Sequence, residues 1–358
     1  MNITNQLSDI NNPLVKMQKM NHEQVVFCYD SETGLRAIIA IHNTALGPAL
    51  GGTRMWNYEN EDKALEDVLR LSRGMTLKAA ISGLQLGGGK AVIIGDANTE
   101  KTEAMMRRFG KFVDSLAGRY ITAKDVGIKT EDMRHVSAET KHVTGIPMDM
   151  GGSGDPSPVT AYGVYWGMKA AAKFKWGSDN LSGKKVLVQG VGNVGEYLVE
   201  YLINEGASVV INDIDEGRLE KVSKLYDVDV FSSQDLYDFP MHIYAPCALG
   251  ATINPETISR LKCDIIAGGA NNQLANEFRD ADLLRKKDIL YAPDFLINAG
   301  GLINVYSEIK GYDRDQALEK TKKIYDTTLE ILQKATIDGL TTHEAALVVA
   351  QQRVGIKS

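Results

Sequence analysis

The chain has 358 residues, a length that favours two domains, and its 44% hydrophobic and 24% charged residues are typical of a globular protein. Its 40 basic and 46 acidic residues give a net charge of −6, and without a basic cluster this argues against nucleic-acid binding. The start MNITNQLSDINNPLV lacks the features of a signal peptide, and no apolar run reaches the roughly 18 residues of a membrane helix. Cys28, Cys247 and Cys263 are far apart without a CxxC spacing, so we expect neither disulfides nor a metal, and a cytoplasmic protein.

Strand and helix patterns alternate through the first half of the chain. Residues 24–30 and 35–43 flank the sequence SETG and predict a β-hairpin. Residues 61–82 carry apolar side chains at helical spacing, and Gly83 is placed to end that helix. Further along, the patterns predict a strand at 90–95, a helix at 101–117 and a strand at 120–123.

Three glycines precede Lys90 in the sequence GLQLGGGKAVI, residues 83–93. Glycine is costly to order, so this run predicts a backbone that bends sharply or lies close to another group. We expect the glycines to let Lys90 sit deep in the protein. A lysine solvated at the surface needs no such approach.

The second half of the chain follows the glycine-rich sequence MDMGGSGDPSPVT, residues 148–160, and opens with a helical sequence at 161–174. Short apolar strands, with helical stretches between the first of them, predict a parallel, doubly wound sheet and therefore an α/β fold. These strands are expected at 184–189, 207–212, 241–245, 263–267 and 289–291. A long amphipathic helix is predicted at 314–337 and a last helix at about 342–354.

Gly190, Gly192 and Gly195 form a G-x-G-x-x-G motif between the apolar strand KVLVQ and a helical segment beginning at Asn193 and Val194. This context, rather than the glycines alone, predicts a Rossmann-type dinucleotide-binding fold. The first glycine permits the turn, the second lets the backbone approach the pyrophosphate, and the third allows close packing of helix on strand. The pyrophosphate then faces the helix N-terminus.

Asp213 ends the next strand, SVVIN, and lies 213 − 195 = 18 residues after the third glycine, close to the roughly 20 expected. A carboxylate there accepts hydrogen bonds from both ribose hydroxyls and repels a 2′-phosphate. The sequence therefore predicts NAD rather than NADP, with Arg218 close enough in sequence to soften the preference.

Three polar residues of the first half have unusual settings: Lys78 in the apolar helix GMTLKAAISG, Lys90 after the glycines, and Asp125 just after the strand YITA. Functional residues of α/β folds tend to follow strands in this way. A single lysine is usually solvated, but the three together indicate a polar substrate site.

The motifs resemble those of the amino acid dehydrogenase family, which contains glutamate, leucine, valine and phenylalanine dehydrogenases. The first half carries LGPALGGTRM, RGMTLKAA, LGGGKAVI and YITAKDVG. The second half carries SGDPSPVTAYGV, GVGNVG, YAPCALGATIN, GGANNQL and APDFLINAGGLINV. The resemblance covers nearly the whole chain in order, and within the family it is greatest to the leucine dehydrogenases.

The resemblance implies a role for each of the three polar residues. Lys78 binds the substrate α-carboxylate, Lys90 is the general base that activates water, and Asp125 exchanges a proton with the substrate amine. In the implied reaction, hydride leaves the α-carbon for NAD⁺, water attacks the iminium, and ammonia leaves. Burial and nearby positive charge can lower the pKa of a lysine to roughly 7–8, as such a base requires. Lys124, beside Asp125, stands where an acidic residue is expected.

The resemblance also assigns binding residues. The substrate contacts are Lys78, Gly51, Gly52, Met75 and Asn272, with a side-chain pocket of Leu50, Ala123, Leu302 and Val305. The cofactor contacts are Thr160, Ala245, Pro246, Cys247 and Asn272, together with the glycine motif and Asp213; Asn271 is the alternative to Asn272.

The expected pocket is aliphatic. Glutamate dehydrogenases place a lysine at the position of Leu50, and a buried γ-carboxylate without a partner costs several kcal/mol. We therefore expect oxidative deamination of L-leucine, valine and isoleucine. Phenylalanine dehydrogenase is the alternative, since a single methylene changes discrimination only about 10–200-fold.

We expect two domains. Residues 1–147, completed by a C-terminal helix at about 336–358, form the catalytic and oligomerisation domain, and residues 148–335 form the NAD-binding domain. The glycines at 151–154 are a hinge candidate for a closure that excludes water. The resemblance implies a homo-oligomer, commonly an octamer among leucine dehydrogenases. The alternative of another class is a non-catalytic NAD-binding regulator, which has no need for the three polar residues together.

Overall fold

The computed structural model describes residues 12–231 and 235–355, which form two compact units. Unit 1 comprises the described residues through Gly154, together with Val305–Asp313 and the residues from Arg353 onward. Unit 2 comprises the described residues of Asp155–Asn304 and Arg314–Gln352. The first boundary between the units therefore falls after Gly154, whereas the predicted boundary was after residue 147. Of the C-terminal helix expected to complete the catalytic domain, the described residues from Arg353 belong to unit 1.

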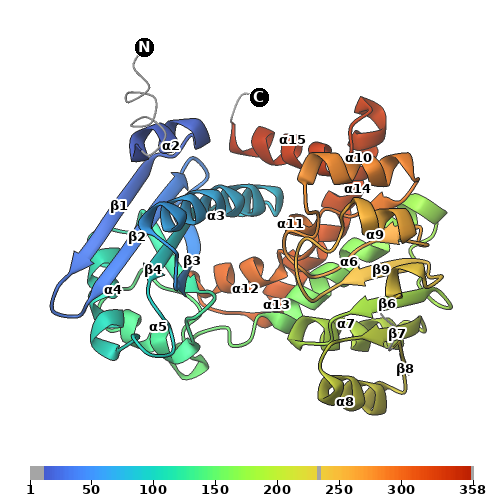
Figure 1. The fold of residues 1–358 in the computed structure, drawn as a ribbon, viewed down its shortest axis with the longest axis horizontal. Helices are drawn as coiled ribbons and strands as arrows, with labels where there is room; N and C mark the ends of the chain where they lie inside the picture. Colours follow the sequence, from blue (N-terminus) through green and yellow to red (C-terminus); the bar gives the residue numbers. More distant parts are fainter. Residues whose placement is uncertain (1–11, 232–234, 356–358) are drawn as a thin grey trace. The chain divides into compact units, whose positions relative to one another are not determined.

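Unit 1 is built on a five-stranded mixed sheet with the order β1-β2-β4-β3-β5, drawn in blue to teal in Figure 1. The first two strands form the predicted antiparallel hairpin, whereas β3 runs parallel to both β4 and β5. The strands are β1 (Gln24–Asp30), β2 (Leu35–Asn43), β3 (Ala49–Trp56), β4 (Gly87–Ile94) and β5 (Tyr120–Lys124).

Helices cover both faces of this sheet. On one face, Val68 and Leu69 of helix α3 pack against Ile38 and Val92. On the other, residues of α4 and α5 pack against a separate apolar cluster that includes Tyr120. The helices of this part are α2 (Pro13–Met20), α3 (Glu61–Ile81), α4 (Glu103–Asp114) and α5 (Thr130–Ser137), followed by the short 3-10 helix η1 (Met148–Met150).

Unit 2 contains a six-stranded parallel sheet with the order β11-β10-β9-β6-β7-β8, which confirms the predicted doubly wound topology. Successive strands are laid down outward from β6 in one direction and then, from β9, in the other, so the switch point lies between β6 and β9. The strands are β6 (Lys185–Gln189), β7 (Ser208–Asn212), β8 (Asp229–Val230), β9 (Ile243–Pro246), β10 (Ile265–Ile266) and β11 (Leu290–Tyr291).

Several helices of unit 2 flank this sheet (Figure 1). Helices α9 and α10 contribute to an apolar cluster with Leu187 and Tyr244 of the sheet, and α6 packs on α7 and α14. The helices are α6 (Ser157–Trp176), α7 (Asn193–Asn204), α8 (Glu216–Tyr226), η2 (Leu236–Asp238), α9 (Pro255–Arg260), α10 (Glu277–Lys286), α11 (Asp294–Ile297), α13 (Arg314–Lys322), α14 (Ile324–Asp338) and α15 (Thr342–Val354), whose last two residues belong to unit 1. Helix α12 (Gly300–Glu308) carries the chain from unit 2 back into unit 1.

Two predictions need correction. The helix expected at 314–337 is two helices, because the helical hydrogen bonding is interrupted at Lys323. The strand expected at 90–95 begins at Gly87, so the three glycines belong to β4. Strand β3 and helix α5 were not predicted, since neither has a regular alternation of apolar and polar side chains.

Glu308 joins two separate segments of unit 1. One carboxylate oxygen accepts a hydrogen bond from the Gly145 amide at 2.8 Å, and the other accepts one from the Ser153 amide at 2.9 Å. The Ser153 hydroxyl also donates to this carboxylate. The glycine-rich segment predicted as a hinge, residues 151–154, is therefore held to Glu308 through Ser153, while Gly151 and Gly154 take left-handed φ angles of 88° and 73°.

Candidate active site

The glycines before Lys90 lie in an extended, fully buried strand and make no turn. A Cβ atom on Gly88 would overlap the backbone of Thr76 in helix α3 and would lie 2.6 Å from the Ser72 carbonyl oxygen. A Cβ on Gly89 would lie 2.7 Å from the Tyr120 ring on the opposite face. Of the two expectations for this run, the sharp bend is wrong and the close approach is confirmed, but the approaching groups are a helix backbone and an aromatic ring.

This packing places Lys90 deep in unit 1, as expected. Its side chain is 8% exposed, and its Nζ donates to Oδ2 of Asp125 at 2.6 Å. Asp125 follows directly on β5, two strands away in the sheet order, so sheet pairing brings residues 35 positions apart into one ion pair. The structure thus joins two of the three predicted polar residues.

The ion pair and its burial act in opposite directions on Lys90. Burial lowers the pKa of Lys90 and outweighs the attraction of Asp125, while Arg54 lowers it further. For Asp125, burial alone raises the pKa, but Lys90 and then Arg54 hold it below its usual value. Asp125 is therefore ionised at neutral pH, beside an amine whose proton is easier to remove than that of an ordinary lysine.

Arg54 is a member of this cluster that sequence analysis missed. Its Nε lies 3.3 Å from Oδ2 of Asp125, the same oxygen that Lys90 contacts, and its other end donates to Asp67 of helix α3 at 2.9 Å. Tyr58 donates to the same Asp67 oxygen at 2.7 Å. Arg54 is the only charged residue of the motif LGPALGGTRM, which is the signal that could have found it.

Side-chain alternation puts two of the predicted pocket residues on the face that carries Lys90. Leu50, Gly52 and Arg54 alternate along β3, and Gly52 pairs with Ala123 of β5. Leu50 is 1% and Ala123 7% exposed. Their role as a substrate pocket stays a prediction.

The two glycines of β3 are restricted by their neighbours. A Cβ on Gly51 would overlap the Gly89 carbonyl oxygen, and one on Gly52 would lie 2.9 Å from Cβ of Asp125. The Gly51 carbonyl also accepts a hydrogen bond from Tyr120 at 2.7 Å. Both glycines are therefore needed to bring the strands and Asp125 together, whether or not they contact substrate.

Met75 and Lys78 lie on helix α3, the helix that packs against Gly88. Both side chains are half-buried. Lys78 lies eleven residues after Asp67, close to three helical turns, so the two residues share a face about 16 Å apart along the axis. The contact of Thr76 with Gly88 places this end of α3 against the strand that carries Lys90.

Lys124, the departure from the family pattern, donates to the Thr130 hydroxyl at 3.2 Å, at the first residue of helix α5. Its ammonium is thus engaged with the start of helix α5. No ion pair between Lys124 and Asp125 occurs in the described structure.

The G-x-G-x-x-G sequence of unit 2 begins at the carboxyl end of β6, beside the switch point. Gly190 has a φ of 92°, which other residues rarely adopt, and a Cβ on Gly195 would overlap the Gly190 carbonyl. At Gly192, by contrast, the nearest atom to a Cβ is an Arg218 nitrogen at 3.9 Å. The space beside Gly190 and Gly195 is thus occupied by protein atoms. The space beside Gly192 is open, as close approach of a pyrophosphate requires.

Helix α7 starts at this open glycine, with Gly192 as its N-cap and Asn193 and Val194 in its first turn. No side chain caps it, whereas Asp215 caps α8 and Asn276 caps α10. Amide groups at an uncapped N-terminus, with the helix dipole, favour an anion. These residues fit a dinucleotide, and the predicted contacts remain proposals.

Asp213 lies beside the same turn. Its Oδ2 accepts a hydrogen bond from the Val191 amide at 2.8 Å, and its Oδ1 accepts one from the Asp215 amide at 3.0 Å. These bonds fix the carboxylate next to the glycine-rich turn, while the side chain of Arg218 reaches Gly192.

Ala245 and Pro246 end strand β9 and Cys247 follows, on the other side of the switch point. The Cys247 sulfur accepts a hydrogen bond from the Gly269 amide at 3.3 Å. Burial raises the pKa of Cys247 to about 11, so it is a thiol at neutral pH.

The remaining predicted residues occupy loops and helix ends. Asn272 is exposed, with a left-handed φ of 51°, whereas Asn271 accepts a hydrogen bond from Asn298 at 2.9 Å. The Thr160 hydroxyl donates to the Pro156 carbonyl at 3.0 Å. Leu302 and Val305 lie on helix α12, in unit 2 and unit 1 respectively.

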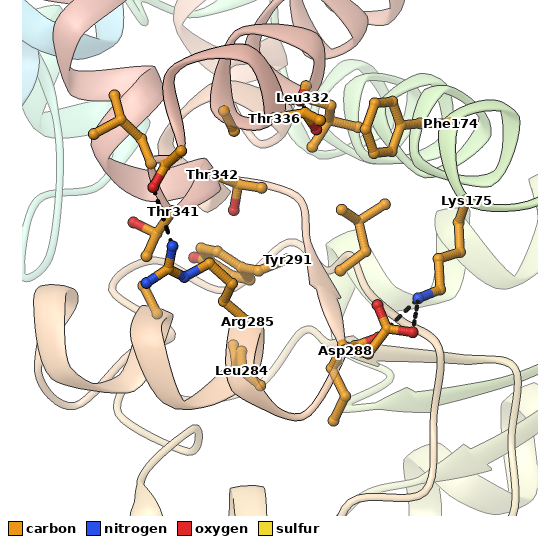
Figure 2. Close-up of a pocket in the computed structure, with 16 residues that line it drawn as sticks. Phe174, Lys175, Leu284, Arg285, Asp288, Tyr291, Leu332, Thr336, Thr341 and Thr342 are labelled. Atoms are coloured by element: carbon orange, nitrogen blue, oxygen red, sulfur yellow. Dashed lines mark hydrogen bonds and ion pairs between the residues drawn. The ribbon is translucent and has the colours of Figure 1, made fainter.

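Unit 2 also has a cavity of about 330 Å³, shown in Figure 2. It lies by the start of β11, so it is at the amino edge of the parallel sheet, opposite to the glycine-rich turn. Its cations are engaged, because Lys175 pairs with Asp288 at 2.9 Å and Arg285 donates to the Gly339 carbonyl at 3.0 Å. It is distinct from the predicted cofactor site.

Comparison with known proteins decides the family. The family model described as "Glu/Leu/Phe/Val dehydrogenase, dimerisation domain" matches residues 22–142. The family model described as "Glutamate/Leucine/Phenylalanine/Valine dehydrogenase" matches residues 151–217 and 211–357. The chain belongs to the Glu/Leu/Phe/Val dehydrogenase family.

Individual relatives differ in their substrates. Leucine dehydrogenase of Bacillus cereus is 52% identical over 338 residues, covering 94% of this chain and 92% of the relative. Phenylalanine dehydrogenase of Lysinibacillus sphaericus is 48% identical over 344 residues, covering 95% and 90%. The crystal structure of L-tryptophan dehydrogenase from Nostoc punctiforme has a TM-score of 0.87 and 46% identity, covering 96% of this chain and 98% of that one.

Family membership establishes the class of reaction. This chain is therefore an NAD(P)-dependent enzyme that catalyses the oxidative deamination of an amino acid. The match to the dimerisation domain indicates a homo-oligomer. Among the described residues, no helix combines the length and the apolar character needed to cross a bilayer.

Proposed function

We propose that this enzyme is an NAD-dependent dehydrogenase of branched-chain L-amino acids, with L-leucine as its main substrate. The observation that carries the proposal is the pair of the buried Lys90 and the partly buried Asp125, 2.6 Å apart, on the sheet face shared with Leu50 and Ala123. A polar pair for the α-amino group thus adjoins apolar positions suited to an aliphatic side chain.

A bound nicotinamide supplies the hydride acceptor for the α-carbon. Lys90, whose pKa burial lowers, takes a proton from the water that adds to the oxidised α-carbon. Asp125, held ionised by Lys90 and Arg54, exchanges a proton with the substrate amine. Lys78 binds the α-carboxylate, a role supported by its place on the helix that packs against Gly88.

An aliphatic substrate is supported by Leu50 and Ala123 and by the 52% identity to leucine dehydrogenases. Neither residue can neutralise a γ-carboxylate, which disfavours glutamate. An aromatic amino acid dehydrogenase is the second candidate, because relatives that act on tryptophan and phenylalanine are 49% and 48% identical.

NAD is proposed over NADP because the Asp213 carboxylate is fixed beside the turn, where it repels a 2′-phosphate. We further propose an octamer and a cytoplasmic location. The location agrees with three free cysteines.

The test is nicotinamide absorbance on mixing the enzyme with NAD⁺ or NADP⁺ and each of Leu, Val, Ile, Phe, Trp and Glu. We expect the largest kcat/KM with L-leucine and NAD⁺. A higher value with phenylalanine or tryptophan would transfer the assignment to the second candidate. Cofactor binding without turnover of any amino acid would support a non-catalytic regulator instead.

A further inference from the structure

The cluster around Lys90 contains a residue to which no role is yet assigned. Arg54 lies on β3, between β4, which carries Lys90, and β5, which Asp125 follows. Its guanidinium group makes two contacts with opposite ends of the cluster, to Asp125 at 3.3 Å and to Asp67 at 2.9 Å. The arginine side chain is 25% exposed, so these contacts are only partly screened by water.

We propose that Arg54 is a positioning residue, which holds the Asp125 carboxylate beside the Lys90 ammonium and ties both, through Asp67, to helix α3. The inference rests on the proposed function, because it assigns Arg54 to the residues named there as base and proton carrier. Arg54 acts through Asp125 and has no contact with the reacting atoms in this account.

The geometry favours this role over a general structural one. Two donors, Lys90 Nζ and Arg54 Nε, share Oδ2 of Asp125, which fixes the carboxylate from two directions. The planar guanidinium group can span two carboxylates in a way that a lysine ammonium cannot. At the other end, Asp67 also accepts hydrogen bonds from Tyr58 at 2.7 Å and from Arg70 at 2.9 Å, so it is a fixed anchor on α3.

The charged groups of the cluster are linked in a chain. Lys90 and Arg54 are the cations that contact Asp125, and Arg54 and Arg70 are cations that contact Asp67, so removal of Arg54 takes a cationic partner from each carboxylate. Other titratable groups on the elements packed around Lys90 include Lys78, Arg70 and Arg73 on α3, Tyr58 after β3, Tyr120 and Lys124 on β5 and His42 on β2. Of these, Arg70 and Tyr58 contact Asp67, Lys124 contacts Thr130, and His42 contacts Thr76.

Two substitutions change the charge of this cluster in opposite directions. Arg54→Gln removes a positive charge and should raise the apparent pKa of Lys90, whereas Asp67→Asn removes a negative charge and should lower it. The acid limb of the kcat/KM profile for L-leucine should move to higher pH in the first variant and to lower pH in the second. For Arg54→Gln we expect at least an approximately tenfold loss of kcat/KM at pH 7.5.

Arg54→Lys keeps the charge but cannot reach both carboxylates, so its acid limb should stay near that of the wild type while kcat falls. Arg70→Gln is the matched control, because Arg70 contacts Asp67 without contacting Asp125. We expect its profile to match that of the wild type.

The apparent pKa of Lys90 can also be measured without turnover, from the pH dependence of its acetylation by acetic anhydride, followed by mass spectrometry. This keeps the inference separate from the proposed function: an enzyme inactive on every amino acid overturns the function, while the labelling still reports on Arg54. If Arg54→Gln does not fold, Asp67→Asn supplies the test. The inference is overturned if the variant measured, Arg54→Gln or Asp67→Asn, gives the same profile and the same labelling as Arg70→Gln.

Discussion

The absence of a glycine side chain has different consequences in the two glycine-rich stretches of this enzyme, residues 87–89 in unit 1 and residues 190–195 in unit 2. In β4, the space beside Gly88 and Gly89 is filled by a helix backbone and an aromatic ring. In the turn after β6, the space beside Gly192 is open. Glycine therefore serves internal packing around a buried lysine in one unit and, at Gly192, leaves open the space proposed for the cofactor in the other.

The largest effect is expected from the residue that the first stretch buries. Lys90→Ala should lower kcat with L-leucine by about 10²–10⁴-fold at neutral pH, because the proposed general base is lost. NAD⁺ affinity, measured by fluorescence titration, should change little, since the predicted cofactor residues belong to unit 2. Lys16→Ala, which removes a lysine paired with Asp62 on the outside of α3, is the control and should keep its turnover. Normal kcat in Lys90→Ala would refute the role as base.

Gly88→Ala tests whether the first stretch is shaped by packing. The added methyl group overlaps the Thr76 backbone, so we expect a loss of about 2–3 kcal/mol in the free energy of unfolding, measured in urea. Gly74→Ala is the matched control, because Gly74 lies on helix α3, which also carries Thr76, and no neighbouring atom lies within 4 Å of its Cβ position. That change should stabilise the protein by about 0.5–1 kcal/mol. Equal effects of the two substitutions would contradict the packing argument.

The helix that contacts Gly88 is also held by a buried histidine, which makes the stability of unit 1 sensitive to acid. His42 contacts the Met20 carbonyl at 3.1 Å, which requires a proton on Nε2, and its Nδ1 then accepts from the Thr76 hydroxyl at 2.8 Å. Burial, with His22 and Arg73 nearby, lowers the pKa of His42 to about 4. The neutral form is therefore the one that the fold stabilises.

Because the unfolded chain binds this proton near pH 6.5 and the folded one only near pH 4, stability is fully present above pH 6.5 and is lost as the pH falls toward 4. For His42 the loss is about 2 kcal/mol at pH 5. Urea unfolding of the wild type and of His42→Gln between pH 5 and 7.5 measures it. The variant should show a shallower pH dependence, and parallel curves would exclude His42 as the source.

Gly192→Ala should have the smallest effect on the fold and a specific effect on the cofactor. Gly192 has a φ of −68° and an open Cβ position, so the free energy of unfolding should change by less than about 0.5 kcal/mol. The methyl group would occupy the proposed pyrophosphate site, and we expect KM for NAD⁺ to rise about tenfold. Gly195→Ala, which overlaps the Gly190 carbonyl, should instead destabilise unit 2. An unchanged KM in Gly192→Ala would move the cofactor site elsewhere.

The parts of the fold that could be predicted are those with a regular pattern. The doubly wound sheet follows from short apolar strands and the G-x-G-x-x-G turn, and helix α3 follows from apolar spacing. Strand β3 was not predicted because Gly51 and Gly52 break the expected alternation. The atoms that require glycine at these two positions belong to neighbouring strands and to Asp125. The break at Lys323 escaped because the apolar stripe continues through it.

The candidate site was predictable in its parts but not in its connections. Lys90 and Asp125 were recognisable from their local sequence settings. Arg54 is marked in the sequence only as the single charge of its motif, because its importance comes from two contacts that exist only after β3, β5 and α3 have packed together.

The chain passes between the two units at four points in its described part, after residues 154, 304, 313 and 352. A protease that cut at the first of these points would release a fragment ending at Gly154 but lacking Glu308, the side chain that receives hydrogen bonds from Gly145 and Ser153. Neither unit can be obtained by a single truncation, so exchange of the cofactor-binding part between relatives would require four well-chosen splice junctions rather than one.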